Sequence, residues 1–257
     1  MSVWLIEIER TRLVLVSILT VVLNGANTIA KTIESVLNQT NKNIEYIIID
    51  GGSTDNTVSI AESFRPNFDL QGIPYKVVSQ KDNGMYDALN RGAMLAQGEL
   101  VGQINADDWY EIDAVETMLD LYDQEQYDVA WGSIRIQGQK NWIKHAKIGR
   151  LWSTSGWCHP GMFSKRQILL EFPYALESMY DDFDFITAVH VAGKKLVTTD
   201  HIISNFSFGK GGMSTKKGIK EVKKRVDITY GIYKKYGMSK LYWWYRWAYE
   251  IAKEILG

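Results

Sequence analysis

The chain has 257 residues, 46% of them hydrophobic, and its 29 basic and 30 acidic residues give a formal net charge of −1. This length can bury one large core or two small ones. The balanced charge argues against a general polyanion binder, so nucleic acid is not expected as a partner. The single cysteine, Cys158, excludes an intrachain disulfide framework and suits a reducing compartment.

The N-terminal stretch MSVWLIEIERTRLVLVSILTVVLN shows no export signal. No basic region precedes its apolar residues, and charged residues interrupt them, namely Glu7, Glu9, Arg10 and Arg12. Elsewhere no uninterrupted apolar stretch is long enough to span a bilayer. We therefore expect a cytoplasmic protein, and leave open a peripheral position on the inner face of the plasma membrane.

The first half alternates strand patterns with helical ones. Branched apolar residues indicate strands, and apolar residues at helical spacing indicate helices. The predicted strands cover 13–22, 44–50, 75–80 and 99–105, and the predicted helices cover 27–40, 53–64 and 84–98. This alternation indicates an α/β fold, with βαβ units and a mostly parallel sheet flanked by helices. In such sheets, ligands bind beyond the carboxyl ends of the strands.

Acidic residues follow three of these strands. Asp50, Asp82 and the adjacent pair Asp107–Asp108 would all lie at the same edge of the sheet. Adjacent carboxylates repel each other and cost desolvation energy when buried. A solvated turn that caps the next helix would explain the pair alone. Three acidic strand ends on one edge favour a binding site.

The second half is less regular. A strand is predicted at 127–136, with a hairpin around Gly138. Residues 150–168 indicate an aromatic loop followed by a short helix, and 177–193 a helix that begins with several acids. Residues 194–215 indicate two short strands and a glycine-bearing loop. No linker or repeat interrupts the chain, so we expect one compact domain with a C-terminal helical extension.

Several common catalytic motifs are missing from the sequence. The turn VVLNGANTIA contains a single glycine, Gly25, and lacks the dinucleotide-binding fingerprint, and no P-loop occurs. Ser53 in DGGSTDNT lacks the spacing of a nucleophile elbow. The four histidines show no zinc-ligand spacing, and Cys158 is interpreted as a packed thiol.

Two stretches, SILTVVLNGANTIAKTIESVLNQTNKNIEYIIIDGGSTDNT and DNGMYDALNRGAMLAQGELVGQINADD, resemble the family 2 glycosyltransferases of bacterial polysaccharide and lipid-linked glycan synthesis. These are inverting, nucleotide-sugar-dependent enzymes with the Rossmann-like GT-A fold. The resemblance implies a glycosyltransferase domain over 1–215, with a nucleotide-sugar-binding half at about 13–105 and an acceptor half at about 106–215. A basic, aromatic helical extension over 216–257 would follow it.

The resemblance assigns donor binding to the strand ends and the loops that follow them. Asp50 would accept the imide N–H of a base or a ribose hydroxyl, or else act only as a turn residue. Arg91 would offer planar donors to phosphate, or else pair with Asp87 on the helix surface. The expected donor-binding residues are Thr20, Val22, Asn24, Asp50, Asp82, Gly84, Asn90, Arg91, Asn105, Ala106 and Asp107. UDP is the expected nucleotide, ahead of dTDP and GDP.

The NADD segment resembles the metal-binding acidic motif of the family, although Asn105 stands where many members carry aspartate. Asp107 is the expected ligand of a Mg²⁺ or Mn²⁺ ion that bridges the donor diphosphate, with Asp108 in support. The loop GKGGMST, 209–215, would close over the donor with Lys210 near the phosphates, or be a plain flexible loop.

Inversion requires a base that takes the proton of the acceptor hydroxyl. By resemblance, MYDDFDF supplies it: Asp182, with Asp184 behind it and Asp181 beside it. The alternative is that these acids only favour the positive end of a helix. His159 in WCHPGMF resembles an acceptor-side position, and a structural histidine is an equal alternative.

The C-terminal region is basic. From Gly209 onward, twelve cations stand against four acids, and the chain ends in the aromatic pattern KLYWWYRWAYEIAKEIL. An amphipathic helix of this kind can bind a membrane surface through residues 240–257. It can also pack on the catalytic domain or on a second subunit of a homo-oligomer.

The sequence therefore predicts a metal-dependent hexosyl- or N-acetylhexosaminyl-transferase. It would move a sugar from a nucleoside-diphosphate sugar to a glycan or polyprenyl-linked acceptor hydroxyl. Because of Asn105, the alternative is a non-catalytic nucleotide-sugar-binding module or an inactive partner subunit. A sugar-nucleotide-forming nucleotidyltransferase is disfavoured, since VVLNGAN lacks the glycine- and arginine-rich loop of that class.

Overall fold

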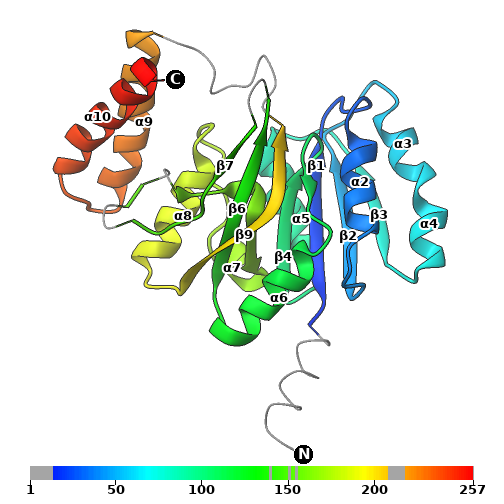
Figure 1. Ribbon diagram of the computed structural model, residues 1–257. Coiled ribbons are helices and arrows are strands. Elements are labelled where there is room, and N and C mark those ends of the chain that lie inside the picture. Colours follow the sequence, from blue (N-terminus) through cyan, green and yellow to red (C-terminus); the bar gives the residue numbers. More distant parts are fainter. Residues whose placement is uncertain (1–13, 139–140, 150–151, 154–155, 208–217, 257) are drawn as a thin grey trace, which may run out of the picture. The chain divides into compact units, whose positions relative to one another are not determined.

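The computed structural model describes residues 14–138, 141–149, 152–153, 156–207 and 218–256 (Figure 1). The chain divides into two compact units. The first comprises Met1–Pro173 and Lys195–Phe208, and the second comprises Tyr174–Lys194 and Gly209–Gly257. Within the described residues, the first unit contains the whole β-sheet and the second contains three helices.

Four parallel strands form one half of the sheet, in the spatial order β3-β2-β1-β4. The strands are β1 (Val16–Val22), β2 (Ile44–Asp50), β3 (Tyr75–Ser79) and β4 (Leu100–Asn105). The helices between them are α2 (Ile29–Leu37), α3 (Thr57–Ser63), α4 (Arg65–Leu70) and α5 (Met85–Leu95). The predicted α/β fold, with a mostly parallel sheet flanked by helices, is confirmed. Helix α4, which contains a proline in its first turn, was not predicted.

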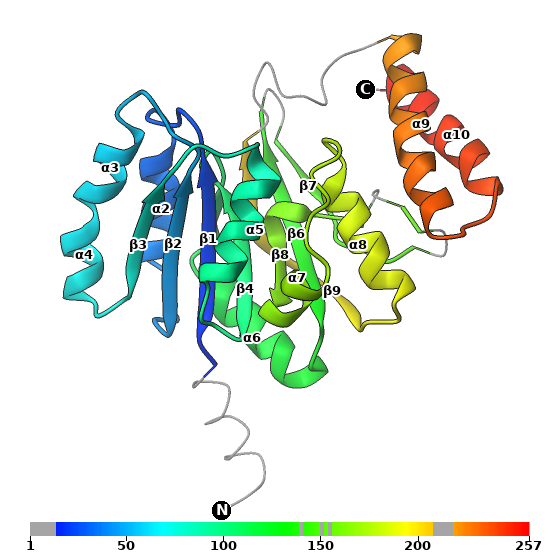
Figure 2. The same ribbon diagram turned by 180° about the vertical axis from the view of Figure 1, so that it is seen from behind.

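Alternate residues of β1 pack on opposite faces of the sheet, as the two-residue period of a strand requires. Val16 and Ile18 belong to the core cluster that also contains Ile33 of α2. Leu19 points to α5 on the other face, where a Cβ atom at Gly92 would lie 3.0 Å from its Cδ1. Figure 2 shows α5 in front of the sheet, on the side opposite α2 in Figure 1.

A buried carboxylate ties three segments of this half together. Glu45 Oε1 accepts hydrogen bonds from the Ser17 hydroxyl (2.5 Å) and from the backbone N–H groups of Gln97 (2.5 Å) and Gly98 (3.2 Å). A Cβ atom at Gly98 would lie 2.6 Å from the Ser17 backbone nitrogen, so this close approach requires glycine. The contacts fix the start of β4 against β1 and β2.

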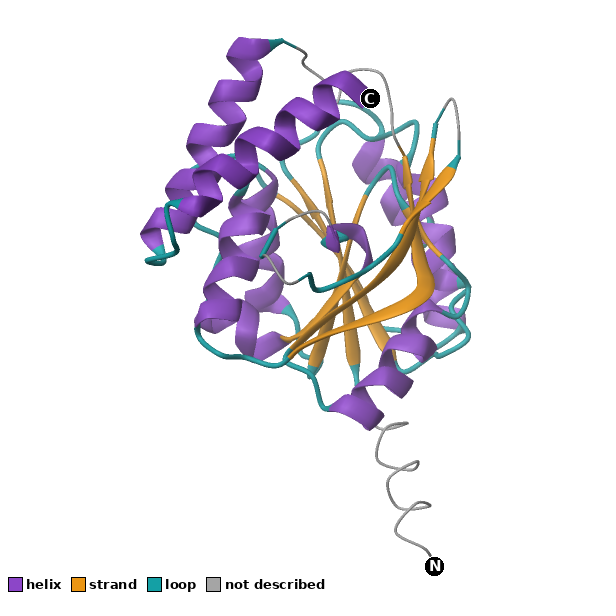
Figure 3. Ribbon diagram, turned by 60° about the vertical axis from the view of Figure 1, so that its left-hand side comes forward, coloured by secondary structure: helices purple, strands orange, loops and turns teal. Residues whose placement is uncertain are grey.

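The other half of the sheet mixes antiparallel and parallel pairs. It contains β5 (Trp109–Tyr110), β6 (Val129–Gln137), β7 (Trp142–Lys144), β8 (Met162–Lys165) and β9 (Leu196–Ser207), together with helix α6 (Ala114–Glu125), the short 3₁₀ helix η2 (His159–Gly161) and helix α7 (Arg166–Glu171). Strand β8 lies antiparallel between β4 and β6, and β9 runs parallel to β6. Figure 3 shows these strands in orange among the helices.

The structure of this half of the sheet differs from the sequence-based expectations in three places. The predicted pair of short strands is one strand, β9, with a register irregularity near Ser133 of β6. At this irregularity the backbones approach closely, because a Cβ atom at Gly132 would lie 2.1 Å from Ile203 Cγ1. The region predicted as an aromatic loop contains strand β8, and helix α6 was not predicted. The hairpin around Gly138 is confirmed by the antiparallel pair β6–β7.

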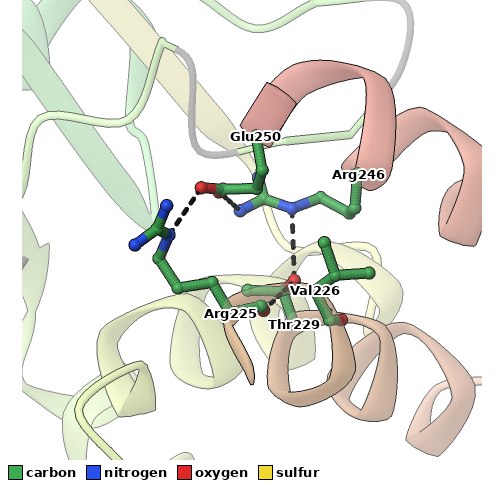
Figure 4. A network of polar contacts seen from close by, with 5 residues as sticks. All are labelled: Arg225, Val226, Thr229, Arg246 and Glu250. Carbon is green, nitrogen blue, oxygen red and sulfur yellow. Dashed lines mark hydrogen bonds and ion pairs between the residues drawn. The ribbon is translucent and has the colours of Figure 1, made fainter. Parts of the chain in front are cut away.

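The second unit contains α8 (Asp181–Val191), α9 (Ile219–Lys235) and α10 (Leu241–Leu256). Helices α9 and α10 share a buried polar network, drawn in Figure 4. Arg246 pairs with Glu250 at 2.6 Å, and Arg225 of α9 pairs with the same carboxylate at 2.7 Å. No helix in the described residues is both long enough and apolar enough to cross a membrane.

Candidate functional site

The carboxyl ends of the four parallel strands lie level with one another. In the strand register Val22 pairs with Asp50, Asp50 pairs with Ser79, and Val21 pairs with Asn105. The expectation that the acidic strand ends share one edge of the sheet is therefore confirmed. Such an edge is where α/β sheets bind ligands.

A cavity of about 510 Å³ opens at this edge, between the ends of β1 and β4 and the start of α5. Of the residues predicted to bind a donor, it is lined by Val22, Asn24, Asp82, Gly84, Asn105, Ala106 and Asp107. Lining residues that the sequence analysis did not select are Val21, Leu23, Gly25, Thr28, Met85 and Ala88. These are mainly apolar or small, so no chemical signal separated them from core residues.

The loop after β1 is held by the loop after β2. Asn24, with a positive φ of 52°, donates its N–H to the Ser53 hydroxyl (2.7 Å) and accepts the Thr54 N–H at Oδ1 (2.9 Å). Asp55 accepts the Ala26 N–H (3.1 Å), and Thr57 accepts the Gly25 N–H (2.8 Å). The polar run STDNT, which follows β2, supplies these contacts and so supports one wall of the cavity.

Asp50 is fully buried at the end of β2. Its Oδ2 accepts the Ser79 hydroxyl (2.6 Å) and the N–H groups of Gly52 (3.1 Å) and Ser53 (2.9 Å). Its Oδ1 is buried and has no hydrogen-bond partner among the described residues. A buried acceptor without a partner costs about 1–3 kcal/mol. The turn role considered for Asp50 is therefore real, but it leaves one oxygen unexplained.

Asp82 lies where the end of β2 approaches the start of α5. Its Oδ1 accepts the Gly84 N–H (2.9 Å), and its Oδ2 lies 2.7 Å from the place that a Cβ atom of Gly51 would take. Gly51 is therefore needed to leave room for this carboxylate. Gly84 has a φ of 113°, a backbone conformation that favours glycine.

The two acids of NADD have different environments. Asp107 is exposed and lines the cavity, whereas Asp108 is fully buried. Asp108 accepts the Ser207 N–H (2.8 Å) at Oδ1 and lies 3.4 Å from the Asn105 amide nitrogen at Oδ2. Burial, opposed by the hydrogen bond from Ser207, raises the pKa of Asp108 to about 8. The sequence alone could not distinguish these two roles.

Oxygen donors at the cavity suit a hard divalent cation. No group of three or more His, Cys, Asp or Glu side chains within the described ranges could enclose a metal. Mg²⁺, however, usually binds one or two carboxylates together with substrate phosphates. Asp107 and the Asn105 amide oxygen fit this pattern, provided that a diphosphate supplies the remaining ligands.

Four predicted donor residues do not line the cavity, and the buried Asp50 described above is one of them. Thr20 is buried in β1, where it accepts a hydrogen bond from the Tyr46 hydroxyl (2.9 Å). Arg91 donates to the Gln80 side chain at 3.1 Å, so the considered pair with Asp87 is not the contact it makes. Asn90 is half-buried on α5.

The three acids predicted as catalytic begin helix α8 in the second unit. Asp181 accepts the N–H groups of Glu177 (2.9 Å) and Ser178 (2.8 Å) and so closes the turn that leads into the helix. Asp184 pairs with Lys235 at 2.8 Å and keeps a buried Oδ1 without a partner in the described part of the chain. Asp182 is half-buried. The predicted loop 209–215 lies outside the described residues.

The remaining candidates lie in an aromatic cluster of the first unit. His159 lies beside Trp157, with ring centres 6.3 Å apart, and Trp157 packs edge-on against Trp131. Cys158 is buried, and burial raises the pKa of its thiol to about 11. A protonated, buried thiol agrees with the interpretation of a packed side chain.

Known proteins resemble this chain in sequence. The family model described as Glycosyl transferase family 2 matches residues 17–185. A PGL/p-HBAD biosynthesis glycosyltransferase of Mycobacterium tuberculosis is 29% identical over 218 residues, which cover 83% of this chain and 84% of the relative. The chondroitin synthase of Escherichia coli is 38% identical over 111 residues, covering 43% of this chain and 16% of that protein.

Solved structures share the fold. Staphylococcus aureus TarS (residues 1–349) in complex with UDP-GlcNAc superposes with a TM-score of 0.68 at 18% identity, over 86% of this chain and 65% of the TarS chain. The mannosyltransferase PcManGT of Pyrobaculum calidifontis, in complex with GDP-Man and Mn²⁺, gives a TM-score of 0.62 at 14% identity, over 94% and 75%. The aligned part is less than two thirds of the TarS chain. The predicted GT-A fold is confirmed.

Proposed function

Because the chain belongs to glycosyl transferase family 2, we propose that it is an inverting, metal-dependent enzyme that moves a sugar from a UDP-sugar to a hydroxyl group. The acceptor would be a glycan or a lipid-linked molecule in bacterial surface-polysaccharide synthesis. The observation that carries the proposal is the cavity at the ends of β1 and β4, where an exposed carboxylate, Asp107, meets apolar and small residues. Its volume falls within the roughly 300–1,000 Å³ typical of small-molecule sites.

Asp50 is the proposed recognition residue for the nucleoside. Its buried Oδ1 is an acceptor at the same strand edge as the cavity, and the imide N–H of uracil or a ribose hydroxyl would satisfy it. TarS, which shares the fold, was solved with UDP-GlcNAc. PcManGT was solved with GDP-Man, so the choice of UDP needs a direct test.

Asp107, with Asn105 and Asp108 in support, would hold Mg²⁺ or Mn²⁺ beside the donor diphosphate. A divalent cation there supplies Lewis-acid stabilisation of the departing diphosphate. The chain's own part is to aim the Asp107 carboxylate into the cavity. The hydrogen bond from the Ser207 N–H to Asp108 fixes the backbone turn behind it.

Asp182 is the proposed base. It would take the proton of the acceptor hydroxyl while that oxygen bonds to the anomeric carbon and the bond to the diphosphate breaks. The other two acids have structural contacts that suit other roles, since Asp181 closes the turn before α8 and Asp184 pairs with Lys235. The predicted domain boundary at residue 215 and the cytoplasmic location remain part of the proposal.

A thermal-shift experiment tests the donor site. The protein is melted with UDP, GDP or dTDP, each with Mn²⁺ or with EDTA. Asp107→Ala is compared with Asp69→Ala, which removes an exposed carboxylate from α4. A ligand at a hundred times its Kd stabilises a protein by about 2.7 kcal/mol. We expect a Mn²⁺-dependent shift with UDP that Asp107→Ala loses and Asp69→Ala keeps.

Each result that contradicts this expectation would overturn a different part of the proposal. A folded protein that none of the three nucleotides stabilises would overturn the donor-site proposal. A shift of equal size in Asp107→Ala and wild type would overturn the metal assignment alone. Nucleotide binding without sugar transfer, measured with UDP-sugars and a lipid-linked acceptor, would favour the non-catalytic module.

A further inference from the structure

Helix α10 has its charged residues on the inside. Arg246 and Glu250 are each 2% exposed, and they are the two charged residues within 241–252, the part of α10 whose side chains are described. Arg246 also donates to the Thr229 hydroxyl of α9 at 3.1 Å, and Arg225 of α9 completes the network (Figure 4). A surface helix normally has the opposite arrangement, with charges in the solvent and apolar residues inside.

The outer face of α10 is correspondingly apolar. Leu241 is 74% exposed and Trp244 is 67% exposed, and Ala248 and Ala252 are exposed one and two turns further on. These four residues recur every three or four positions and so form one stripe along the helix. We call them the apolar stripe. Exposed apolar side chains that gather on one face of a helix are a feature of interaction sites.

The turn that precedes the apolar stripe and the exposed residues of α9 are mainly positively charged. Lys240 directly precedes Leu241, and Lys234 lies in the last turn of α9, which a short turn joins to α10. Lys220, Lys223 and Lys224 are also exposed on α9. On the same helix Asp227 is exposed and Glu221 is half-buried, so cations predominate. The partner should therefore combine an apolar phase with negative charge.

We propose that the apolar stripe inserts into the surface of an anionic lipid bilayer, with Lys240, which adjoins the stripe, at the headgroups. Tryptophan is enriched at the boundary between lipid and water, and lysine beside it is attracted to anionic headgroups. A 16-residue helix is about 24 Å long, less than the hydrocarbon core of about 30 Å. The helix therefore lies along the bilayer surface.

A second copy of the chain fits this face less well. If two copies met in parallel, across a two-fold axis along the apolar stripe, the two Lys240 side chains would come near each other. A bilayer has no such conflict. The buried Arg246–Glu250 pair gives the arrangement a structural basis, because it joins the inner face of α10 to α9 and turns the apolar stripe outward.

Vesicle binding of the full chain tests the inference without any sugar substrate, so the outcome is independent of the proposed transfer. Co-sedimentation is measured with phosphatidylcholine vesicles and with vesicles containing 30% phosphatidylglycerol. Leu241→Asp and Trp244→Glu alter the apolar stripe. Leu70→Asp on α4 and Trp142→Glu on β7 are matched controls, because Leu70 is 87% and Trp142 is 54% exposed. All four sites are exposed, and circular dichroism verifies folding.

We expect binding to the anionic vesicles, at least ten-fold weaker in either stripe variant and unchanged within two-fold in both controls. Lys240→Gln should weaken binding about five-fold at low salt, and high salt should remove that difference. The inference is overturned if the folded wild-type chain binds neither type of vesicle. It is also overturned if the controls weaken binding as much as the stripe variants. A dimer that Trp244→Glu dissociates, without vesicle binding, would assign the stripe to a second copy instead.

Discussion

Glu250 is the residue whose removal tests the α9–α10 packing most directly. Its carboxylate neutralises two arginines, at 2.6 Å from Arg246 and 2.7 Å from Arg225. In Glu250→Ala, Arg246 would remain buried without its carboxylate partner, and it would keep its hydrogen bond to Thr229. Removing one partner of a buried ion pair costs about 3–5 kcal/mol. Arg225 adds less to this cost, because its side chain is partly exposed and can turn to solvent.

Amide hydrogen exchange measures this cost locally. Where exchange follows the opening equilibrium, a loss of about 3 kcal/mol accelerates it by about a hundred-fold. We expect this acceleration in peptides from α9 and α10, whereas peptides from β1 and β4 in the same sample should not change. Asp227→Ala on α9 is the matched control, because this acid is exposed and surface substitutions usually change stability by less than about 0.5 kcal/mol.

A double variant separates the cost of a lone charge from the value of the pair. Arg246→Met with Glu250→Leu removes both charges, and Thr229 keeps its bonds to the carbonyls of Arg225 (2.7 Å) and Val226 (3.2 Å). Apolar replacement of a buried pair is often neutral or stabilising, so exchange should stay near the wild-type rate. If Glu250→Ala exchanges within three-fold of wild type, or if the double variant is the less stable of the two, the reasoning is refuted.

Three further perturbations test the first unit. Glu45→Ala removes the acceptor of the Ser17 hydroxyl and of the Gln97 N–H, whereas the Gly98 N–H keeps the Ser17 hydroxyl oxygen at 2.8 Å. The change should cost about 1–3 kcal/mol in urea unfolding, and a loss below about 0.5 kcal/mol, the usual size of a surface effect, would contradict this. Gly132→Ala places a methyl group against Ile203 and should cost about 1–3 kcal/mol. Gly231→Ala is the control, because its added methyl group meets no neighbour within 4 Å and its φ is not positive. The raised pKa of Cys158 means that its contribution to stability is complete below pH 9 and is lost as the pH rises to about 11. Cys158→Ala should lose less stability over that pH range, and equal slopes in the two proteins would refute the shift.

The sequence was a good guide where one rule determines the structure. The branched apolar runs of β1, β2 and β4 are fully buried in a parallel sheet, so pattern and environment agree. Parallel pairing then places Asp50 level with Val22 and Ser79 in the neighbouring strands, and this brings the acidic strand ends to one edge of the sheet. Helix α6 shows the limit, because its first apolar residues follow an acidic, aromatic turn that has no clear helix signal.

The roles of individual side chains were harder to predict from the sequence than the positions of the strands. Asp107 and Asp108 are neighbours in sequence, yet one lines the cavity and the other is buried, because the turn after β4 points them in different directions. Thr20 faces the interior, and Arg91 contacts Gln80, because tertiary partners that lie elsewhere in the chain select these orientations. Residue spacing carries no information about such partners.

The loops after β1 and β2 are bonded so closely that donor selectivity can be engineered at a distance. Ser53 and Thr54 do not line the cavity, yet each hydrogen-bonds Asn24, which does. Substitutions at 53 and 54 would therefore shift the cavity wall while keeping every lining side chain. A library at these positions, selected for acceptance of alternative nucleotide sugars, would explore pocket shape without removing a contact residue.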